Sequence, residues 1–414
     1  MIVYKFGGAS VKDSKSIKNI LDIVLSANFD NLIIVISAMG KTTNALEKIT
    51  NLAFNDKDFS QEILKLKDYH IEIAVNLVNN QEIINKINAI FDNIEDAIKK
   101  YKSRDFDFFY DQIVSFGEIL STTIISYYLN NEQLTNKYVD SRKIIITDDN
   151  YKNANINYKT TAENIKNLTT QNHKIIITQG FIGSTGNSAT TLGREGSDYS
   201  AAVYAYFTNA ESLTIWKDVD GILTADPRIF NDTVKLDKIS YSEAIELAYF
   251  GAQVIHPKTI KPLENKNIPL FVKSFINSYS EGTKITKINE KIKLQPIFII
   301  KENQVLLSIS PKDFSFIVEQ NLSNIFQILS DFKISANLFQ HSAISFSICI
   351  DNSQKLKSLI ETLNRNYKVK YNLNLQLATI RHYTSDAIDK IVNNKKILVQ
   401  QKSRNTVRFV MQNK

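Results

Sequence analysis

The sequence predicts an α/β protein, a mainly parallel sheet covered by helices on both faces, followed by a smaller C-terminal α+β region of the ferredoxin-like type. Three observations predict this class. Over about the first 280 residues, short runs rich in Ile and Val alternate with helical patterns, as in βαβ units. These runs are apolar on both faces, as parallel strands between helices are. From about Ile297 the order changes to strand, helix, strand, strand, helix.

The expected N-terminal strands share a core of Ile, Leu and Val, and they are residues 2–6, 32–37, 143–147, 174–181, 213–216 and 269–275. The expected helices between them include residues 14–25, 44–54, 113–129, 197–207 and 242–250. Segment 113–129 is apolar, but Glu118 inside it would cost about 3 kcal/mol in a bilayer. A buried or half-buried helix is therefore expected there.

The C-terminal region predicts one full split βαβ unit and an incomplete second one. The full unit comprises strands at 305–310, 334–340, 343–350 and 374–383, with helices at 317–332 and 355–365. A short helix at 385–394 and strands at 397–401 and 406–411 are too few for another copy. Since residues 277–296 are polar and end at a proline, we expect domains at 1–285 and 297–414.

Composition narrows the class of protein further. At roughly 150 residues per domain, 414 residues allow two or three domains. Hydrophobic residues at 43% and charged residues at 22% exclude a disordered chain, and the net charge of +7 demands no polyanionic partner. The single cysteine, Cys349, cannot form an internal disulfide, and no apolar signal segment follows Met1. A cytoplasmic protein that binds neither membrane nor nucleic acid is expected.

Glycine indicates where a site lies. Only 12 glycines occur, and five of them fall within residues 180–196. Near the start, a strand ends in Gly7 and Gly8 and passes into a helix, whose expected cap is Ser10 or Ser14. Backbone N–H groups at such a helix start favour a phosphate, and Lys5 adds a full charge. Alone, this motif favours a solvent-facing lysine before an ordinary tight turn.

Three further motifs carry charge at expected strand ends or helix starts. In TQGFIGSTGNSATTLGREGSDYSAA, Arg194 can clamp a carboxylate or phosphate, while Ser197 is the expected helix cap and Asp198 follows it. In WKDVDGILTADPR, carboxylates past a parallel strand lie where such sheets bind ligands. Glu118 of FGE opens an apolar helix, where a buried carboxylate needs an ammonium or guanidinium partner.

Seven strings, in order and at their spacing, resemble those of the aspartate kinases in the amino-acid kinase superfamily: KFGGAS, SAMGKTTN, SFGEILST, TQGFIG, TTLGREGSDYSAA, WKDVDGILTADPR and FGAQVIHPKT. The resemblance covers residues 1 to about 285. The string TTLGR-x-GSD separates aspartate kinases from glutamate, acetylglutamate, carbamate and uridylate kinases. The region after Ile297 resembles ACT regulatory domains. An amino-acid kinase fold followed by an ACT-like region is therefore expected.

This resemblance implies ATP- and Mg²⁺-dependent transfer of the γ-phosphoryl group to the side-chain carboxylate of L-aspartate, giving 4-phospho-L-aspartate. The product leads to lysine, threonine and methionine. Because the nucleophile is already ionised at neutral pH, no general base is needed. The resemblance also implies a homodimer, a lysine or threonine effector, and Mg²⁺ held by nucleotide phosphates without a dedicated metal ligand. A non-catalytic amino-acid sensor, or a related kinase with another substrate, remains an alternative.

Site residues are also implied by the resemblance. Lys5 and Asp198 are expected to be catalytic, with Lys5 holding the transferring phosphoryl group. Those expected to bind aspartate are Ser37, Thr43, Glu118, Phe181, Arg194 and Ser197, with Asp198 beside Glu118 at the α-ammonium. Those expected to bind ATP are Lys5, Gly7, Gly8, Lys217, Asp218, Arg228 and Lys258. Lys217, Leu223 and Gln253 depart from the family pattern, and Lys258 is expected to supply the charge that Gln253 lacks.

Overall fold

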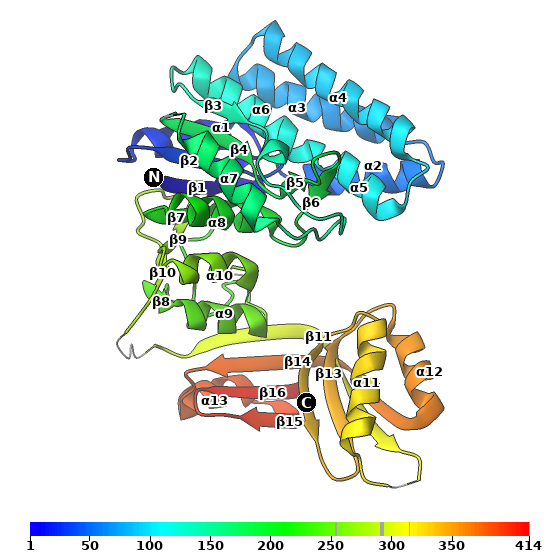
Figure 1. The fold of residues 1–414 in the computed structure, drawn as a ribbon. Coiled ribbons are helices and arrows are strands. Elements are labelled where there is room, and N and C mark those ends of the chain that lie inside the picture. Colours follow the sequence, from blue (N-terminus) through cyan, green and yellow to red (C-terminus); the bar gives the residue numbers. More distant parts are fainter. Residues whose placement is uncertain (172, 253–254, 290–293, 314, 414) are drawn as a thin grey trace. The chain divides into compact units, whose positions relative to one another are not determined.

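A computed structural model describes residues 1–171, 173–252, 255–289, 294–313 and 315–413 (Figure 1). Its internal contacts divide the chain into two compact units. Unit 1 comprises Met1–Ile222, Lys235–Ala248 and Gln253–Asn289, and unit 2 comprises Leu223–Val234, Tyr249–Ala252 and Glu290–Lys414. Two short segments of the N-terminal part thus belong to unit 2, which a single boundary between 285 and 297 did not anticipate. Assigning catalysis to one part and regulation to the other stays a prediction.

Unit 1 is built on an eight-stranded sheet in the order β3-β4-β2-β1-β7-β9-β10-β8 (Figure 1). Its strands are β1 (Ile2–Phe6), β2 (Leu32–Ile36), β3 (Lys137–Val139), β4 (Ile175–Gln179), β7 (Ser212–Lys217), β8 (Lys238–Ser240), β9 (Leu270–Ser274) and β10 (Thr283–Thr286). Neighbours pair in parallel except β9 and β10. Every residue of β2 is buried, as expected for a strand covered on both faces. The predicted fold class is confirmed.

The helices of unit 1 are α1 (Ser14–Leu25), α2 (Thr42–Phe54), α3 (Ser60–Leu77), α4 (Gln81–Tyr101), α5 (Phe106–Val114), α6 (Phe116–Asn131), α7 (Tyr158–Thr169), α8 (Gly196–Thr208), α9 (Tyr241–Phe250), whose last two residues belong to unit 2, and α10 (Pro257–Asn265). One apolar core joins β2 and β4 to α2 through α6, and Ile34, Ile87 and Phe109 are fully buried in it. Within the described residues no helix has the length and apolar character to cross a membrane.

Helix starts differ from the expected caps. Asp13, not Ser10 or Ser14, caps α1 by accepting a hydrogen bond from the N–H of Ser16 at 2.7 Å. Gly8 instead begins a short 3₁₀ turn, Gly8–Val11. The helix after the glycine-rich loop is preceded by Glu195, whose φ of 53° is left-handed, and Ser197 lies inside its first turn. The side-chain carboxylate of Asp13 therefore determines where α1 begins, whereas the left-handed backbone of Glu195 determines where α8 begins.

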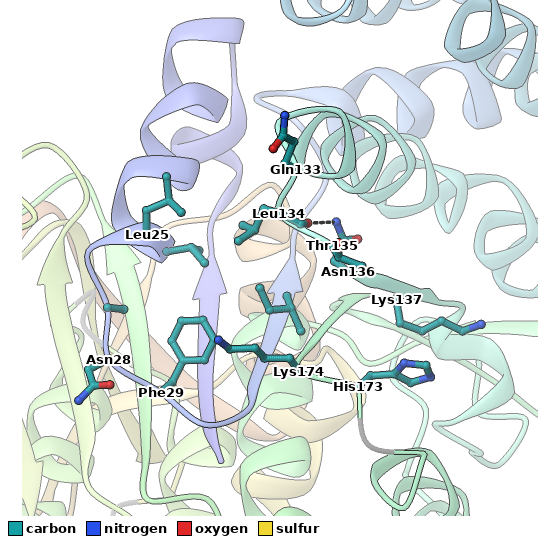
Figure 2. A pocket seen from close by; sticks show the side chains of 13 residues that line it. Leu25, Asn28, Phe29, Gln133, Leu134, Thr135, Asn136, Lys137, His173 and Lys174 are labelled. Carbon is teal, nitrogen blue, oxygen red and sulfur yellow. Dashed lines mark hydrogen bonds between the residues drawn. The ribbon is translucent and has the colours of Figure 1, made fainter.

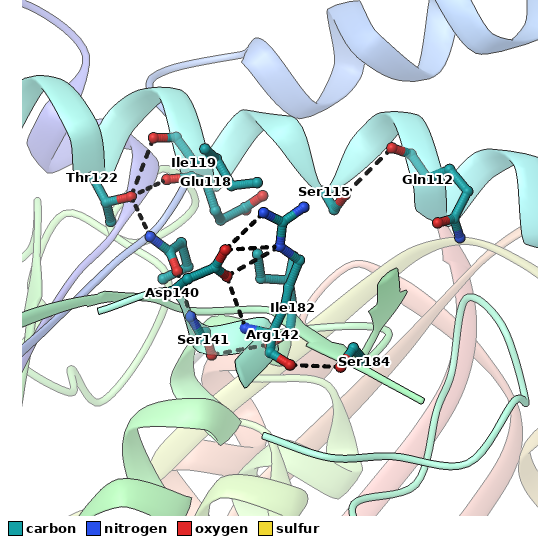
Figure 3. Close-up of polar contacts among 11 residues, drawn as sticks. Gln112, Ser115, Glu118, Ile119, Thr122, Asp140, Ser141, Arg142, Ile182 and Ser184 are labelled. Atoms are coloured by element: carbon teal, nitrogen blue, oxygen red, sulfur yellow. Dashed lines mark hydrogen bonds and ion pairs between the residues drawn. The ribbon is translucent and has the colours of Figure 1, made fainter. Parts of the chain in front are cut away.

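Two further sequence expectations were wrong. Residues 143–147 are not a strand, because Ser141–Lys143 form a 3₁₀ turn and the edge strand is β3 instead. Asp140 accepts hydrogen bonds from the N–H and the guanidinium of Arg142, which favours the turn over a ladder (Figure 3). The expected helix 113–129 is two helices, since Ser115 ends α5 and precedes α6.

Unit 2 contains a six-stranded antiparallel sheet in the order β12-β13-β11-β14-β16-β15. Its elements are β11 (Ile297–Pro311), α11 (Glu319–Asp331), β12 (Ala336–His341), β13 (Phe346–Asp351), α12 (Leu356–Asn366), β14 (Tyr367–Arg381), α13 (Ser385–Val392), β15 (Lys395–Lys402) and β16 (Thr406–Asn413). The elements from β11 to β14 have the expected ferredoxin-like order. The α+β class of this region is confirmed.

Strands β11 and β14 are longer than expected, and each contributes residues to two separate hydrophobic cores. Their register shifts between Lys301 and Gln304, which marks a bulge. On one side of the bulge, Val305 and Ile309 pack with α11 and α12. On the other, Ala378 and Ile380 pack with α13 and β16. The second unit, which the sequence predicts to be incomplete, therefore takes two of its four strands from the ends of β11 and β14.

A hollow of about 760 Å³ lies where strands of the unit 1 sheet begin (Figure 2). It is lined by residues that precede or begin β2, β3 and β4, among them Phe29, Lys137 and Lys174. The Nζ atom of Lys174 lies 5.8 Å from the centre of the Phe29 ring. Since open parallel sheets bind ligands at their carboxyl ends, this edge is opposite to the one expected for a site.

Candidate active site

A second cavity, of about 610 Å³, lies at the carboxyl ends of four neighbouring strands of unit 1. In the parallel register, Phe6 pairs with both Ile36 and Trp216, and Ile36 pairs with Gln179, so β1, β2, β4 and β7 end at one edge. The residues that follow these strands line the cavity. The predicted site residues found there are Lys5, Gly7, Gly8, Ser37, Thr43, Glu118, Phe181, Arg194, Ser197, Asp198, Lys217 and Asp218.

A buried ion pair lies at the cavity wall. Lys5 of β1 and Asp198 of α8 are 8% and 4% exposed, and Lys5 Nζ lies 2.6 Å from Asp198 Oδ1. Lys217 Nζ is 4.0 Å from Asp198 Oδ2. Burial alone would raise the pKa of Asp198, but attraction to Lys5 and Lys217 outweighs burial and lowers it. The carboxylate is therefore charged at neutral pH and holds two ammonium groups near one point.

Gly7 lies beside the ammonium group of this lysine. A Cβ atom there would lie 3.4 Å from Lys5 Nζ, within contact distance of the ammonium. The ammonium group therefore borders a stretch of bare backbone. A phosphate oxygen can approach both backbone N–H groups and Lys5 at such a place.

Glu118 is a buried carboxyl group with unused acceptor capacity. It lies in the first turn of α6, shown in Figure 3, and is 2% exposed. Its Oε1 accepts a hydrogen bond from the N–H of Ala38 at 3.2 Å, while its Oε2 has no hydrogen-bond partner among the described residues. Burial raises the pKa of Glu118 to about 8, and the Ala38 N–H and Lys5 offset this only in part. An ammonium group entering the cavity would supply the missing partner.

Arg194 lines the cavity and is exposed to solvent, so it lies at the cavity mouth. It follows a short hairpin of β5 (Ile182–Ser184) and β6 (Ala189–Thr191). The open end of the hairpin is closed by a hydrogen bond from the N–H of Leu192 to the carbonyl of Phe181, at 2.9 Å. Gly193 has a φ of +75°, and a Cβ there would lie 2.7 Å from Asn153 Oδ1. Only glycine fits there without strain, so the glycine-rich motif sets the course of the chain into Arg194.

Sequence reasoning missed part of the lining, namely Ala9, Ser10, Ala38, Gly40, Tyr110, Lys152, Thr191, Gly193, Glu195, Gly196 and Trp216. Most of these residues lie inside the motif strings and could have been included with the predicted site residues. Lys152 carried no signal, because it lies in a turn outside every motif. Its φ is +64°, and its Nζ lies 3.3 Å from Asp107 Oδ1.

Two predicted nucleotide residues do not line this cavity. Arg228 belongs to unit 2, where it is exposed and pairs with Asp226 at 2.6 Å within the same turn. Lys258 is in unit 1, and its Nζ donates to Asn153 Oδ1 at 2.9 Å. Gln253 lies outside the described residues. The cavity thus brings together the expected aspartate residues and only part of the expected ATP set.

The strand order, the buried lysine and a sheet edge that favours a phosphate indicate an α/β protein that binds a phosphorylated ligand. Comparison with known proteins agrees with this class. The family model described as "Amino acid kinase family" matches residues 1–274. The chain belongs to the amino acid kinase family.

Within that family the chain belongs with the aspartokinases. It is 32% identical over 392 residues to aspartokinase 1, chloroplastic, of Arabidopsis thaliana, covering 88% of this chain and 67% of that protein. It is 32% identical over 356 residues to lysine-sensitive aspartokinase 3 of Escherichia coli, covering 85% and 79%. The predicted family and enzyme class are confirmed.

Solved structures agree over the whole chain. The structure of E. coli aspartokinase III in complex with lysine and aspartate has a TM-score of 0.83 at 28% identity, covering 99% of this chain and 95% of that one. The same enzyme in complex with aspartate and ADP has a TM-score of 0.82 at 27% identity, covering 99% and 96%. The role of each site residue in this chain stays a prediction.

Proposed function

We propose that this chain transfers the γ-phosphoryl group of ATP to the side-chain carboxylate of L-aspartate, forming 4-phospho-L-aspartate and ADP. A carboxylate oxygen attacks the γ-phosphorus, and the bond from that phosphorus to the β,γ-bridging oxygen breaks. The observation that carries the proposal is the Lys5–Asp198 pair, buried at the strand edge with Lys217 nearby. Since an anion must attack a polyanion, fixed positive charge is the main catalytic requirement.

The aspartate side of the cavity offers a partner for each charged group of the substrate. Arg194 at the mouth would clamp the α-carboxylate. Glu118, with one oxygen unpaired, would receive the α-ammonium group together with Asp198. Ser37, Thr43, Phe181 and Ser197 would line the same pocket. The side-chain carboxylate of aspartate would then point toward Lys5.

The nucleotide side is supported by fewer contacts. Gly7, Gly8, Lys217 and Asp218 line the cavity and would face the phosphates. For Arg228 and Lys258, a role in ATP binding rests on family resemblance alone. From the family resemblance, we expect Mg²⁺ to be carried by the nucleotide phosphates without a dedicated metal ligand. Bound in that way, Mg²⁺ would neutralise phosphate charge during transfer.

Regulation and cellular role complete the proposal. An aspartokinase of E. coli has been solved with lysine bound, and unit 2 here has the ferredoxin-like order expected of ACT regulatory domains. We therefore expect an amino-acid effector, lysine or threonine, to bind the C-terminal region. We also expect a cytoplasmic homodimer that opens the route to lysine, threonine and methionine, with no membrane or nucleic-acid partner.

One assay separates this function from its alternatives. The protein is incubated with ATP, Mg²⁺ and L-aspartate, and the acyl phosphate is trapped with hydroxylamine as the hydroxamate. Aspartate-dependent hydroxamate that is lost in Lys5→Met supports the proposal. Aspartate binding without turnover would indicate a sensor, and turnover only with another carboxylic amino acid would indicate a different kinase.

A further inference from the structure

Helix α5 supports the hairpin that ends at the substrate pocket. Two consecutive side chains of this helix bind β6. Gln112 Nε2 donates to the carbonyl of Ala189 at 2.9 Å, and the N–H of Ala189 donates to Gln112 Oε1 at 3.1 Å. Asp111 binds Thr191, the last residue of β6, two residues before the Gly193 turn that leads to Arg194. Asp111 is therefore the member of the pair that lies nearer the pocket.

The carboxylate of Asp111 joins two pocket walls. It is 0% exposed, and its Oδ1 accepts from the hydroxyl of Thr191 at 2.7 Å. Its Oδ2 accepts both the N–H of Thr191 at 2.9 Å and the N–H of Lys152 at 3.0 Å. Lys152 has a left-handed backbone, which costs free energy unless its surroundings hold it. Both Thr191 and Lys152 line the cavity.

The two walls also touch each other. Asn153, next to Lys152, packs so closely on Gly193 that any Cβ there would clash with it. The N–H of Ala154 donates to the carbonyl of Thr191 at 2.9 Å. Burial raises the pKa of Asp111 to about 6, so at pH 7.5 the group is mainly ionised and accepts all three hydrogen bonds.

We infer that Asp111 is a positioning residue for the amino-acid substrate, which fixes the backbone of Thr191 and Lys152 and thereby the place of Arg194 at the pocket mouth. The inference rests on the proposed function, because the aspartate KM is its main readout. Asp111 touches neither substrate in this account. Removal of its side chain should therefore raise the KM for aspartate and leave the KM for ATP unchanged.

The test compares Asp111→Ala and Asp111→Asn in the hydroxamate assay. For Asp111→Ala, the KM for aspartate should rise at least tenfold while the KM for ATP stays within twofold. Asp111→Asn should return the aspartate KM to within about threefold of the wild-type value, because its amide oxygen accepts both N–H groups and the Thr191 hydroxyl can turn to accept from the amide. An aspartate KM within twofold of wild type in Asp111→Ala would overturn the inference.

Controls separate positioning from folding. Asp105→Ala removes the cap of the same helix, a hydrogen bond from the N–H of Phe108 at 2.9 Å, and should lower Tm without changing either KM. An equal rise of the aspartate KM in Asp105→Ala would mean that helix stability alone matters, and would overturn the inference. If Asp111→Ala does not fold, Thr191→Val, which removes only the hydroxyl contact, decides by whether the aspartate KM rises.

Failure of the proposed function gives a different pattern. If the wild type forms no aspartyl hydroxamate, the proposed function fails, and calorimetric binding of aspartate to the same variants still tests Asp111. Binding to wild type that is weakened tenfold in Asp111→Ala and recovered in Asp111→Asn supports the positioning role. Equal binding to all three proteins refutes it.

Discussion

Replacing Glu118 by glutamine should abolish a proton release that accompanies aspartate binding. The pKa of Glu118 is about 8, so at pH 7 roughly nine-tenths of the protein carries a protonated carboxyl group. An arriving α-ammonium group favours the ionised form, and binding should then release about 0.9 proton at pH 7. The affinity of the wild type should rise about tenfold per pH unit until pH 8 and then level off.

Isothermal titration calorimetry in two buffers of different ionisation enthalpy measures this proton directly. Glu118→Gln should bind aspartate more weakly at pH 8.5, with an affinity that does not change between pH 6 and 8.5 and no proton release. Glu163→Gln, at an exposed acid of α7, serves as the matched control and should release the same proton as the wild type. Absence of proton release from the wild type at pH 7 would refute the assignment of Glu118 to the ammonium group.

Four further predictions concern other groups or readouts. Lys5→Met should reduce kcat at least 100-fold in the hydroxamate assay, because a preorganised positive charge is lost; a smaller loss contradicts its catalytic role. Arg194→Ala should raise the aspartate KM about 30-fold, equivalent to about 2 kcal/mol, and an unchanged KM would overturn its assignment. Since the folded-state pKa of Glu118 is raised, its contribution to stability is present below about pH 4.5 and is lost as pH rises through 8. The Tm of Glu118→Gln should therefore rise relative to the wild-type Tm as the pH increases from 4.5 to 8. A difference in Tm that does not change with pH would contradict burial of the ionised Glu118. Titration with lysine and threonine should give heat from one of them, and heat from neither removes the regulatory proposal.

The sequence predicted many of the residues that line the cavity, because their convergence follows from the geometry of a parallel sheet. In a parallel sheet, residues just past the strands meet at one edge, so Gly7, Ser37, Phe181 and Asp218 converge whatever the loops between them do. The glycine-rich string also predicted the loop that leads into Arg194.

What the sequence could not supply depends on contacts between distant segments. Lys152 lines the cavity, and its N–H donates to Asp111, which lies 41 residues earlier in the chain. The strand expected at 143–147 failed because Asp140 and Arg142 stabilise a turn that an apolar run does not reveal. No composition or period encodes such pairings.

The shift of segment 223–234 to unit 2 is a third case. Phe230 stacks on Phe298 with ring centres 5.3 Å apart, and the N–H of Phe298 donates to the carbonyl of Thr224 at 2.7 Å. Both contacts join residues more than 60 positions apart in the sequence. The motif WKDVDGILTADPR is therefore divided between two compact units, although it reads as one string.

Because the long strands β11 and β14 run through both halves of unit 2, neither half can be removed without leaving strands of the other half unpaired. A chain stopped after α13 would leave β14 without its neighbour β16 and would expose the ladder that joins Thr379 to Arg408. A chain begun after the bulge of β11 would remove the partner of residues 377–381. We therefore expect unit 2 to unfold in a single cooperative transition. A destabilising change at either end should then lower the stability of the whole unit through the shared strands.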